Sequence, residues 1–307
     1  MDVSVEPGLR GFPVAPCIFV YPPPSSFAHS HRSGHDYRGE PTPYAWPDVN
    51  SHFGIVDAAG FPKDRFYWYQ AHFTDPSPPL VWLLPQNWNW DASAQPKIDV
   101  WAYSNADSVE LFLNGASQGA RVMTRYGHAE WPATPTTAGS LCAVAYMNAS
   151  GSAPVATQCV NTTGPAAALR ISVQDGAYLG GADGTMVAGC NDVAMVMVEV
   201  VDASGAVVPT ASHNVSFALT SAPAGVLLQG TANGDPAATV NSKNSWRSAF
   251  HGLCQAVITG GDAPGAVTVQ ASTPGLPPVS ITLPIVTPSA GFAAKPPTWC
   301  KALGPRL

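Results

Sequence analysis

The sequence predicts a mainly β protein, and three properties of its composition carry that prediction. The 307 residues include 28 Gly and 31 Pro, so long helices are disfavoured and turns must be frequent. Charged residues make up only 11% of the chain, with five Glu and five Lys, the residues that normally coat exposed helix faces. The abundance of Val, Thr, Ser and Ala favours strands instead.

The first segment, residues 1–76, is mostly irregular and carries one predicted helix. Its first 45 residues are rich in His, Ser, Gly and Pro, and Ile18–Tyr21 is a short strand candidate. From Phe61 the pattern changes, because Pro62 suits a first helical position. Helical spacing then appears at Phe66, Tyr69, Gln70 and Phe73, and the pattern ends at Pro76.

Residues 77–163 predict a first immunoglobulin-like β-sandwich. Lys97–Tyr103 alternates polar and apolar side chains with period two, and Val109–Leu113 repeats the pattern before the turn dipeptide Asn114-Gly115. Leu141–Tyr146 and Val155–Val160 form a further strand pair around a polar loop. Short strands at this spacing are typical of such sandwiches.

Residues 164–287 predict a second sandwich of the same kind, after the break Gly164-Pro165. The expected strands are Ala168–Val173, Val193–Val201, Val215–Leu219, Gln255–Thr259, Ala266–Ala271 and Val279–Leu283. Residues 288–307 are rich in Pro and Ala and are expected to form a loose tail.

Charge and hydropathy exclude two classes of partner. The net charge of −6 and the pI near 5.7 lack the basic footprint of a nucleic-acid binder. No apolar run approaches the roughly 18 to 20 residues of a membrane span, and Met1–Arg10 does not have the pattern of a signal peptide. Three glycosylation sequons, at Asn148, Asn161 and Asn214, lean weakly toward an extracellular or secretory location. The sequence leaves the oligomeric state open.

The six cysteines have no metal-binding spacing, so no metal site is expected from them. Cys142 and Cys159 lie on the two arms of a predicted hairpin and would face each other in a symmetric register. The sequence leaves open whether they form a cross-strand disulfide or two buried thiols. Cys190 and Cys254 stand at the starts of two strands of the second sandwich, and a bridge between its sheets is a weaker expectation.

Three short patterns resemble catalytic sites but lack the context that each chemistry needs. Ser117 lies in a G-x-S-x-G match, but a hairpin turn there replaces the strand-turn-helix of a hydrolase elbow. His29, His31 and His35 with Asp36 could gather around a metal, but a polar loop is the simpler interpretation. Asp36 and Glu40 have no fixed separation on a Gly/Pro-rich loop, whereas a retaining glycosidase needs its carboxyl groups about 5 to 5.5 Å apart.

Aromatic residues cluster just before and inside the first sandwich, and two interpretations remain. They could stack against sugar rings, or they could form a core or a seam between domains, which the sequence favours. The cluster consists of Tyr67, Trp68, Tyr69, Trp82, Trp88, Trp90 and Trp101.

One longer resemblance is more specific than these patterns. The run Asp36-Tyr37-Arg38-Gly39-Glu40-Pro41-Thr42-Pro43-Tyr44, followed by Trp46-Pro47, Ser51–Ile55 and Ala59–Asp64, resembles the end of the catalytic barrel in family 2 glycoside hydrolases of the β-galactosidase type. Leu83-Leu84-Pro85, Trp88-Asn89-Trp90 and Val100–Gly115 resemble the β-sandwich that follows the barrel there. Pro165–Arg170, Val198–Asp202 and Asn233-Gly234-Asp235-Pro236 resemble its terminal immunoglobulin-like domain, so about 250 residues are covered in order.

The resemblance implies hydrolysis of β-galactosides by intact relatives, which use two glutamates on (β/α)₈ barrel strands. No cofactor is expected for this chain. Residues 1–76 could hold only the last strand and helix of such a barrel, and neither glutamate has a matching position. No catalytic residue is therefore assigned, and Asp36 and Tyr37 are expected to lie near the substrate of an intact enzyme. The sequence predicts a C-terminal portion that is inactive alone, with a carbohydrate- or protein-binding module as the alternative.

Overall fold

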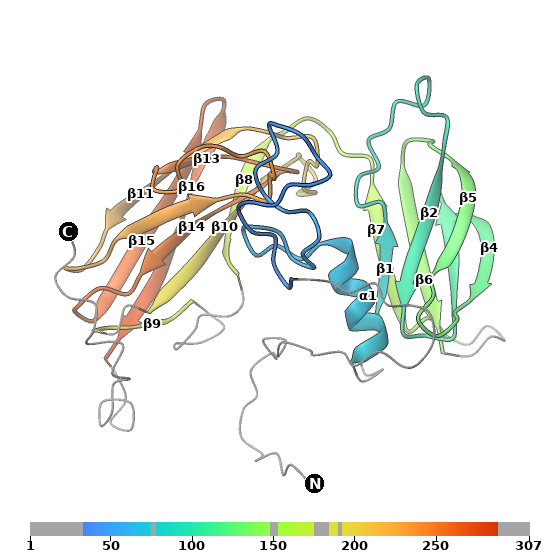
Figure 1. Ribbon diagram of the computed structural model, residues 1–307, viewed down its shortest axis with the longest axis horizontal. Helices are drawn as coiled ribbons and strands as arrows, with labels where there is room; N and C mark the ends of the chain where they lie inside the picture. Colours follow the sequence, from blue (N-terminus) through green and yellow to red (C-terminus); the bar gives the residue numbers. More distant parts are fainter. Residues whose placement is uncertain (1–32, 75–77, 148–152, 175–183, 190–191, 288–307) are drawn as a thin grey trace, which may run out of the picture.

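The structure is a computed structural model that describes residues 33–74, 78–147, 153–174, 184–189 and 192–287. The described residues form one α-helix and sixteen β-strands, arranged as two β-sandwiches (Figure 1). The predicted mainly β class is confirmed. Several positions singled out in the sequence lie outside the described residues: the strand candidate Ile18–Tyr21, His29, His31, Asn148 and the predicted tail.

The first sandwich packs a three-stranded sheet, in the order β1-β2-β5, against a four-stranded sheet, in the order β4-β3-β6-β7. Its core follows the period-two pattern, since Val100 and Ala102 on one sheet and Leu111 and Leu141 on the other are fully buried. The strands are β1 (Val81–Leu84), β2 (Lys97–Ser104), β3 (Ser108–Leu113), β4 (Ala116–Val122), β5 (Ala129–Pro135), β6 (Ser140–Tyr146) and β7 (Ala156–Asn161).

The second sandwich packs a four-stranded sheet, in the order β12-β14-β10-β8, against a five-stranded sheet, in the order β13-β11-β15-β16-β9. Alternate residues of the central strands, such as Val196, Val198, Ala256 and Val269, fill its core. The strands are β8 (Ala168–Val173), β9 (Met186–Val187), β10 (Val193–Val201), β11 (Asn214–Ser221), β12 (Leu228–Ala232), β13 (Trp246–Ser248), β14 (Leu253–Thr259), β15 (Gly265–Thr273) and β16 (Leu276–Val286).

The helix α1 spans Asp64–Phe73 and begins two residues later than expected at its N-terminus. Pro62 does not open the helix, because it forms a β-bridge with Val56 and the following Lys63 is extended, with its N–H donating to Ile55 O at 3.0 Å. At ten residues this helix, the one α-helix in the described part of the chain, is too short to cross a membrane.

The segment before the first sandwich contacts both sandwiches. Residues 33–63, called here the N-terminal loop, lie against the second sandwich near β8, whereas α1 lies against β1 and β2 of the first (Figure 1). The linker between the sandwiches is also held from both sides. Asn89 of the first sandwich bonds to Thr163, and the Asp202 carboxylate of the second accepts the Gly164 N–H at 2.9 Å.

Candidate functional site

Asp36, expected near a substrate, is a structural anchor of the N-terminal loop. Its side chain is only 8% exposed, its Oδ2 lies 2.8 Å from Lys63 Nζ, and its Oδ1 accepts the Gly54 N–H at 2.8 Å. Gly54 is required there, because a Cβ at this position would lie 2.3 Å from the Asp36 backbone nitrogen. Both carboxylate oxygens are therefore engaged, which suits a role in shaping the loop and not in proton transfer.

Tyr37 stands beside this anchor and is 39% exposed. Its backbone is fixed by Ser51, which donates its N–H to Tyr37 O at 2.8 Å and accepts the Tyr37 N–H on its Oγ at 3.0 Å. Its hydroxyl donates to Glu40, and its ring packs edge-on against Phe53. Asp36 thus binds Lys63 and the Gly54 N–H, whereas Glu40 binds the Tyr37 hydroxyl. These contacts do not support an acid and base pair.

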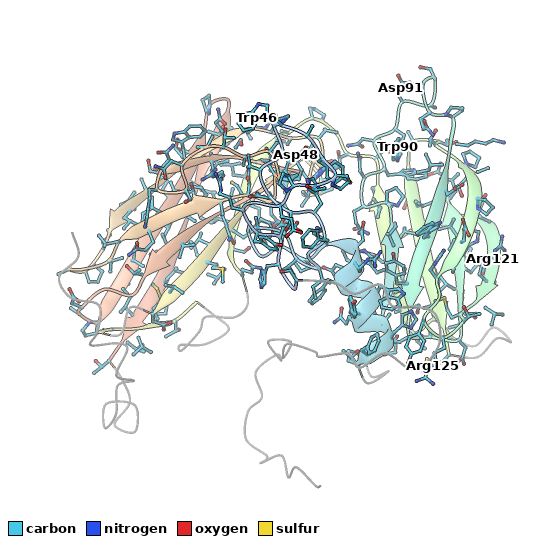
Figure 2. All side chains as sticks on the ribbon, viewed as in Figure 1. Trp46, Asp48, Trp90, Asp91, Arg121 and Arg125 are labelled. Carbon is cyan, nitrogen blue, oxygen red and sulfur yellow. A yellow bond between two sulfur atoms is a disulfide. The ribbon has the colours of Figure 1, made fainter. Side chains whose placement is uncertain are left out.

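Two further aromatic side chains project from the same loop. Tyr44 is 51% exposed and lies 4.0 Å from the His52 ring, and Trp46 is 77% exposed. Figure 2 shows Trp46 and Asp48 at the outer end of the loop. Together with Tyr37 they are exposed aromatic side chains of the N-terminal loop, and exposed aromatic groups bind saccharides or other protein surfaces.

The second sandwich fixes the outer part of the N-terminal loop through main-chain hydrogen bonds. Pro236 O, in the connection between β12 and β13, accepts the N–H groups of Val49 at 3.0 Å and Asn50 at 3.1 Å. Arg38 Nη2 donates to Ala238 O at 2.9 Å. The Asn233-Gly234-Asp235-Pro236 motif of the family resemblance therefore lies against the Asp36-Tyr37 motif, although the two are far apart in the sequence.

The inner part of the loop is held in the same way. Gln255, which is 3% exposed on β14, donates from Nε2 to Ala59 O at 2.5 Å, and Gln174 donates to Gly60 O at 3.2 Å. Asp57 accepts the N–H groups of Ala59 and Phe61 on Oδ1, and burial raises the pKa of its carboxyl group above the usual value.

A cleft of about 300 Å³ lies between the loop and the second sandwich. Composition and spacing give no signal for this cleft, because its two walls meet only in the fold. Its polar lining residues are Asp36, Tyr37, Arg38, Asn50, Thr231, Asn233, Asp235, Ser242 and Arg247.

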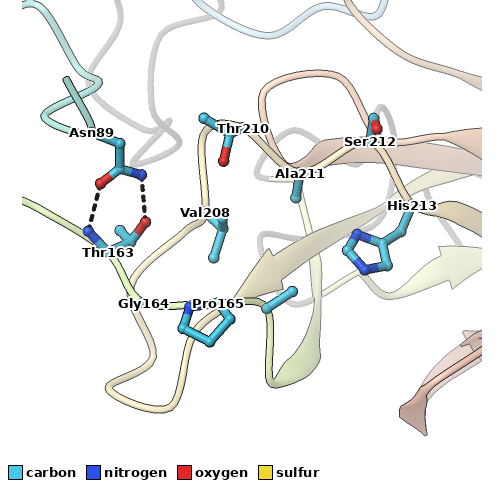
Figure 3. A pocket seen from close by; sticks show the side chains of 10 residues that line it. Asn89, Thr163, Gly164, Pro165, Val208, Thr210, Ala211, Ser212 and His213 are labelled. Atoms are coloured by element: carbon cyan, nitrogen blue, oxygen red, sulfur yellow. Dashed lines mark hydrogen bonds between the residues drawn. The ribbon is translucent and has the colours of Figure 1, made fainter. Parts of the chain in front are cut away.

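A larger and more open groove of about 600 Å³ lies at the junction of the two sandwiches (Figure 3). On one side Asn89 holds Thr163, with Oδ1 accepting the Thr163 N–H and Nδ2 donating to its Oγ1, each at 2.7 Å. The opposite side is formed by residues 208–213, including His213. His213 is the one ionisable side chain among its lining residues, which include no carboxylate, lysine or arginine.

The predicted aromatic cluster divides between core and surface. Trp88 is 1% exposed and belongs to the first core, whereas Trp90 and Trp101 are 38% and 37% exposed. Tyr67 of α1 stacks on Trp82 of β1, with ring centroids 3.3 Å apart, and Trp82 Nε1 donates to Asp64 at 2.9 Å. Part of the cluster is therefore a seam between the helix and the first sandwich, as the sequence favoured.

The remaining catalytic patterns stay without a catalytic environment. Ser117 lies on β4 just after the Asn114-Gly115 turn and donates to Glu110, with no histidine among its hydrogen-bond partners. His35 forms a β-bridge with Val56. No group of three metal-ligating side chains occurs within the ranges that the structure describes.

Cys142 and Cys159 form a disulfide, with an S–S distance of 2.04 Å. They are directly paired on β6 and β7, on the outer face of the sheet. The expected bridge between Cys190 and Cys254 is wrong, because Cys254 is a free thiol. Cys254 is fully buried, and burial raises the pKa of its thiol to about 12. The reason lies in the topology: β10 and β14 are antiparallel neighbours, so their starts lie at opposite ends of the ladder, and Val193 pairs with Thr259. Cys190 lies outside the described residues.

Two family models match the chain, one in each sandwich. Residues 181–282 match "Glycoside hydrolase family 2 C-terminal domain 5", and residues 95–152 match a domain of unknown function, DUF4982.

Curated relatives match over most of the chain. The β-galactosidase BoGH2A of Bacteroides ovatus is 38% identical over 246 residues, which is 80% of this chain and 27% of the relative. A β-glucuronidase of Formosa agariphila is 30% identical over 237 residues, or 77% of this chain and 22% of the relative. The chain therefore spans about a quarter of the length of these two proteins.

Solved structures give the same result. A β-glycosidase from Bacteroides vulgatus superposes with a TM-score of 0.70 at 26% identity, over 82% of this chain and 30% of that structure. A family 2 β-glucuronidase superposes with a TM-score of 0.64 at 28% identity, over 79% of this chain and 24% of that structure. In each case the match covers most of this chain and only a minor part of the larger protein.

Proposed function

Because this chain belongs to glycoside hydrolase family 2 and matches the C-terminal part of its members, we propose that it supplies the accessory sandwiches and a substrate-facing loop to a β-galactosidase-like enzyme. In this proposal residues 1–76 correspond to the end of the catalytic barrel, and the barrel carries both catalytic glutamates. The substrate of the assembled enzyme is a β-galactoside, hydrolysed at its O-glycosidic bond.

The observation that carries the proposal is the way in which the N-terminal loop is built. Its backbone is fixed at Val49, Asn50, Ala59 and Gly60 by the second sandwich, while the side chains of Tyr37, Tyr44 and Trp46 are exposed. These hydrogen bonds fix the loop backbone, and the aromatic side chains of the loop stay exposed. Such a loop is suited to hold aromatic side chains in place for contact with a ligand.

The 307 residues alone are proposed to be inactive. Double displacement at an anomeric carbon needs two carboxyl groups about 5 to 5.5 Å apart, and the Asp36 and Glu40 carboxylates of this loop are committed to other partners. The chain should therefore not hydrolyse a nitrophenyl β-galactoside. Turnover at an enzyme-like rate that survives substitution of Asp36 and Glu40 would contradict this part of the proposal.

A chimera tests the positive part. Residues 33–287 replace the matching C-terminal segment of the Bacteroides ovatus β-galactosidase, and hydrolysis of nitrophenyl β-galactoside is measured. We expect an active chimera in which Tyr37→Ala lowers kcat/KM about tenfold or more, the range for loss of an oriented contact. Val122→Ala, at an apolar residue of β4 that is 69% exposed, is the control and should leave kcat/KM unchanged. An active chimera that is indifferent to Tyr37→Ala would overturn the placement of this loop near the substrate.

The exposure of Trp90 and Trp101 favours a second candidate, a carbohydrate- or protein-binding module. Trp101 is stacked on His128 at 4.3 Å, on the outer side of the β1-β2-β5 sheet. Trp90→Ala tests this idea in a glycan-binding assay, because Trp90 can be removed without opening the core. Trp88→Ala is unsuitable for the test, since Trp88 is a core residue. Binding that is unaffected by Trp90→Ala and Trp101→Ala would count against the module.

A further inference from the structure

Arg247 on β13 is buried without a carboxylate partner. It is 3% exposed, and its guanidinium group donates to neutral acceptors: Thr231 O at 2.8 Å, Val240 O at 3.2 Å and Asn241 O at 3.3 Å. None of the ion pairs between described residues includes it. A desolvated charge without a counter-charge is costly, and carbonyl groups offset only part of that cost.

A second guanidinium group lies close to the first. Arg38 comes from the N-terminal loop and donates to Ala238 O, two residues before the Val240 carbonyl that Arg247 uses. Burial lowers the pKa of Arg247 below its ordinary value. The interaction with Cys254 opposes this shift, and the positive charge of Arg38 adds to it. Both arginines line the 300 Å³ cleft, so two like charges from distant parts of the chain share one cavity.

The carboxylates of the cleft do not neutralise this pair. Asp36 is bound to Lys63 at 2.8 Å, which already balances its charge. Asp235 accepts the Ala237 N–H on Oδ1 and forms no ion pair with a described residue. With Arg38, Arg247 and Asp235 counted together, the cleft keeps one positive charge in excess.

The other lining groups suit a hydroxylated ligand. Tyr37 is one of the lining residues, and Asn50 and Ser242 add amide and hydroxyl groups. The Asn233 amide donates from Nδ2 to Ser248 O at 2.8 Å, which leaves its buried Oδ1 as an acceptor without a partner. A volume of about 300 Å³ is at the lower end of the range for small-ligand sites and is sufficient for one sugar ring.

We propose that this cleft binds the carboxylate of an acidic saccharide between Arg38 and Arg247. The identification of the ligand as a saccharide rests on the proposed function, whereas the binding of a carboxylate rests on the two arginines. The second sandwich would then form one wall of a saccharide-binding site in addition to supporting the loop.

The test is equilibrium binding to the full 307-residue chain at low ionic strength, where charge pairing is least screened. Titration calorimetry compares glucuronate, galactose and inorganic phosphate. We expect saturable binding of glucuronate that is at least about tenfold tighter than that of galactose or phosphate, as expected for a charge-assisted contact combined with ring contacts. No binding of glucuronate, or equal affinity for galactose, would overturn the proposal. Equal affinity for phosphate would overturn the saccharide assignment.

Two variants place the site. Arg38→Ala should weaken glucuronate binding about tenfold or more, because one charged hydrogen-bond donor is lost. Arg125→Ala is the matched control, since Figure 2 places this exposed arginine at the far end of the first sandwich. Equal losses in both variants, or none in Arg38→Ala, would overturn the proposed site.

A third variant changes the charge of the cleft and keeps both arginines. Ser242→Glu places a carboxylate at the rim of the cleft, where it should compete with glucuronate, abolish its binding and raise the unfolding temperature by neutralising the excess charge. A Ser242→Glu chain that binds glucuronate as tightly as the wild type would contradict the proposal. All these readouts are binding or unfolding measurements, so an inactive chimera would refute the proposed function without affecting them.

Discussion

The two sandwiches hold the N-terminal segment by different means. The first holds α1 through ring contacts, with Tyr67 stacked on Trp82, and through two side-chain hydrogen bonds, from Trp82 to Asp64 and between His72 and Gly127 O. The second holds the N-terminal loop mainly through hydrogen bonds to main-chain atoms. Ring contacts tolerate small shifts, because they depend mainly on buried area. Hydrogen bonds to fixed carbonyl groups do not, since they weaken steeply with distance and angle. The part of the segment whose geometry is most closely defined is therefore the loop that carries Tyr37.

The sandwiches also differ in their use of cysteine. The first carries a disulfide on an outer sheet face, and the second buries Cys254 as a thiol in its core. The first core is the smaller of the two, and a covalent link compensates for a small core.

The largest expected effect comes from removing the disulfide. Replacing both Cys142 and Cys159 by Ala should lower the free energy of unfolding of the first sandwich by about 2 to 4 kcal/mol, because the unfolded chain gains the entropy of an open loop. Urea unfolding followed by tryptophan fluorescence measures the change, since most of the tryptophans lie in or beside the first sandwich. Cys254→Ala serves as the control, since it should shift only the transition of the second sandwich. A double variant as stable as the wild type would remove this difference between the sandwiches.

The next effect concerns the hydrogen bonds of the second sandwich. Gln255→Ala leaves the buried Ala59 carbonyl without its partner and should cost about 1 to 3 kcal/mol. Hydrogen exchange of residues 49–60 should accelerate, while exchange in α1 stays the same. Gln118→Ala is the control, because Gln118 bonds only to the carbonyl of nearby Ala116. Unchanged exchange in the loop would show that β14 does not support it.

A smaller effect is expected at the ring contact. Tyr67→Leu removes the stack on Trp82 and should cost about 0.5 to 1.5 kcal/mol, with faster hydrogen exchange in α1 and no change in the loop. Trp101→Leu removes a comparable stack on His128 within the first sandwich and should not affect α1. Faster exchange in the loop as well as the helix would mean that the two attachments are not independent.

The smallest effect is a pH dependence at the linker. Hydrogen bonds from the Ser204 hydroxyl and the Gly164 N–H lower the pKa of Asp202 to about 2. Because the pKa of Asp202 is lower in the folded chain than in the unfolded chain, the ionised carboxylate stabilises the fold at pH values above the unfolded pKa of about 3.9. This contribution is lost as the pH falls toward 2. Asp202→Asn should therefore unfold at a lower temperature than the wild type at pH 6, and the difference should shrink between about pH 4 and pH 2. A difference that is constant over this range would rule out the charge as its cause.

The strands that the sequence predicts are those with regular alternation. The expected Lys97–Tyr103 and Val193–Val201 correspond to β2 and β10 within one residue at either end. Regular alternation is absent from β4 and β5, so neither strand is predicted from the sequence. Gly119 of β4 has a left-handed conformation, and Pro132 interrupts β5. Both strands are held by their neighbours, so pairing overrides the local preference there.

The candidate site was less accessible to sequence reasoning than the fold. The motif identified Asp36 and Tyr37, but it could not show that Lys63 binds the Asp36 carboxylate. The role of Arg247 depends entirely on tertiary structure, because its cleft exists only where the N-terminal loop meets β12 and β13. A buried arginine on a short strand gives no signal by itself, since its burial and its lack of a carboxylate are properties of the fold.

The hydrogen bonds at Pro236 also set an order of events during synthesis. The Asn50 side chain finds its acceptor 185 residues further along the chain, at Asp235, and Arg38 finds its own 200 residues further along, at Ala238. At translation rates of roughly 5 to 20 residues per second, the loop waits about 10 to 40 s for these partners. The loop is synthesised before both sandwiches but is completed only after the ribosome has produced the β12–β13 connection of the second sandwich. Until then its aromatic side chains are open to other proteins, and chaperone binding should concentrate on this interval.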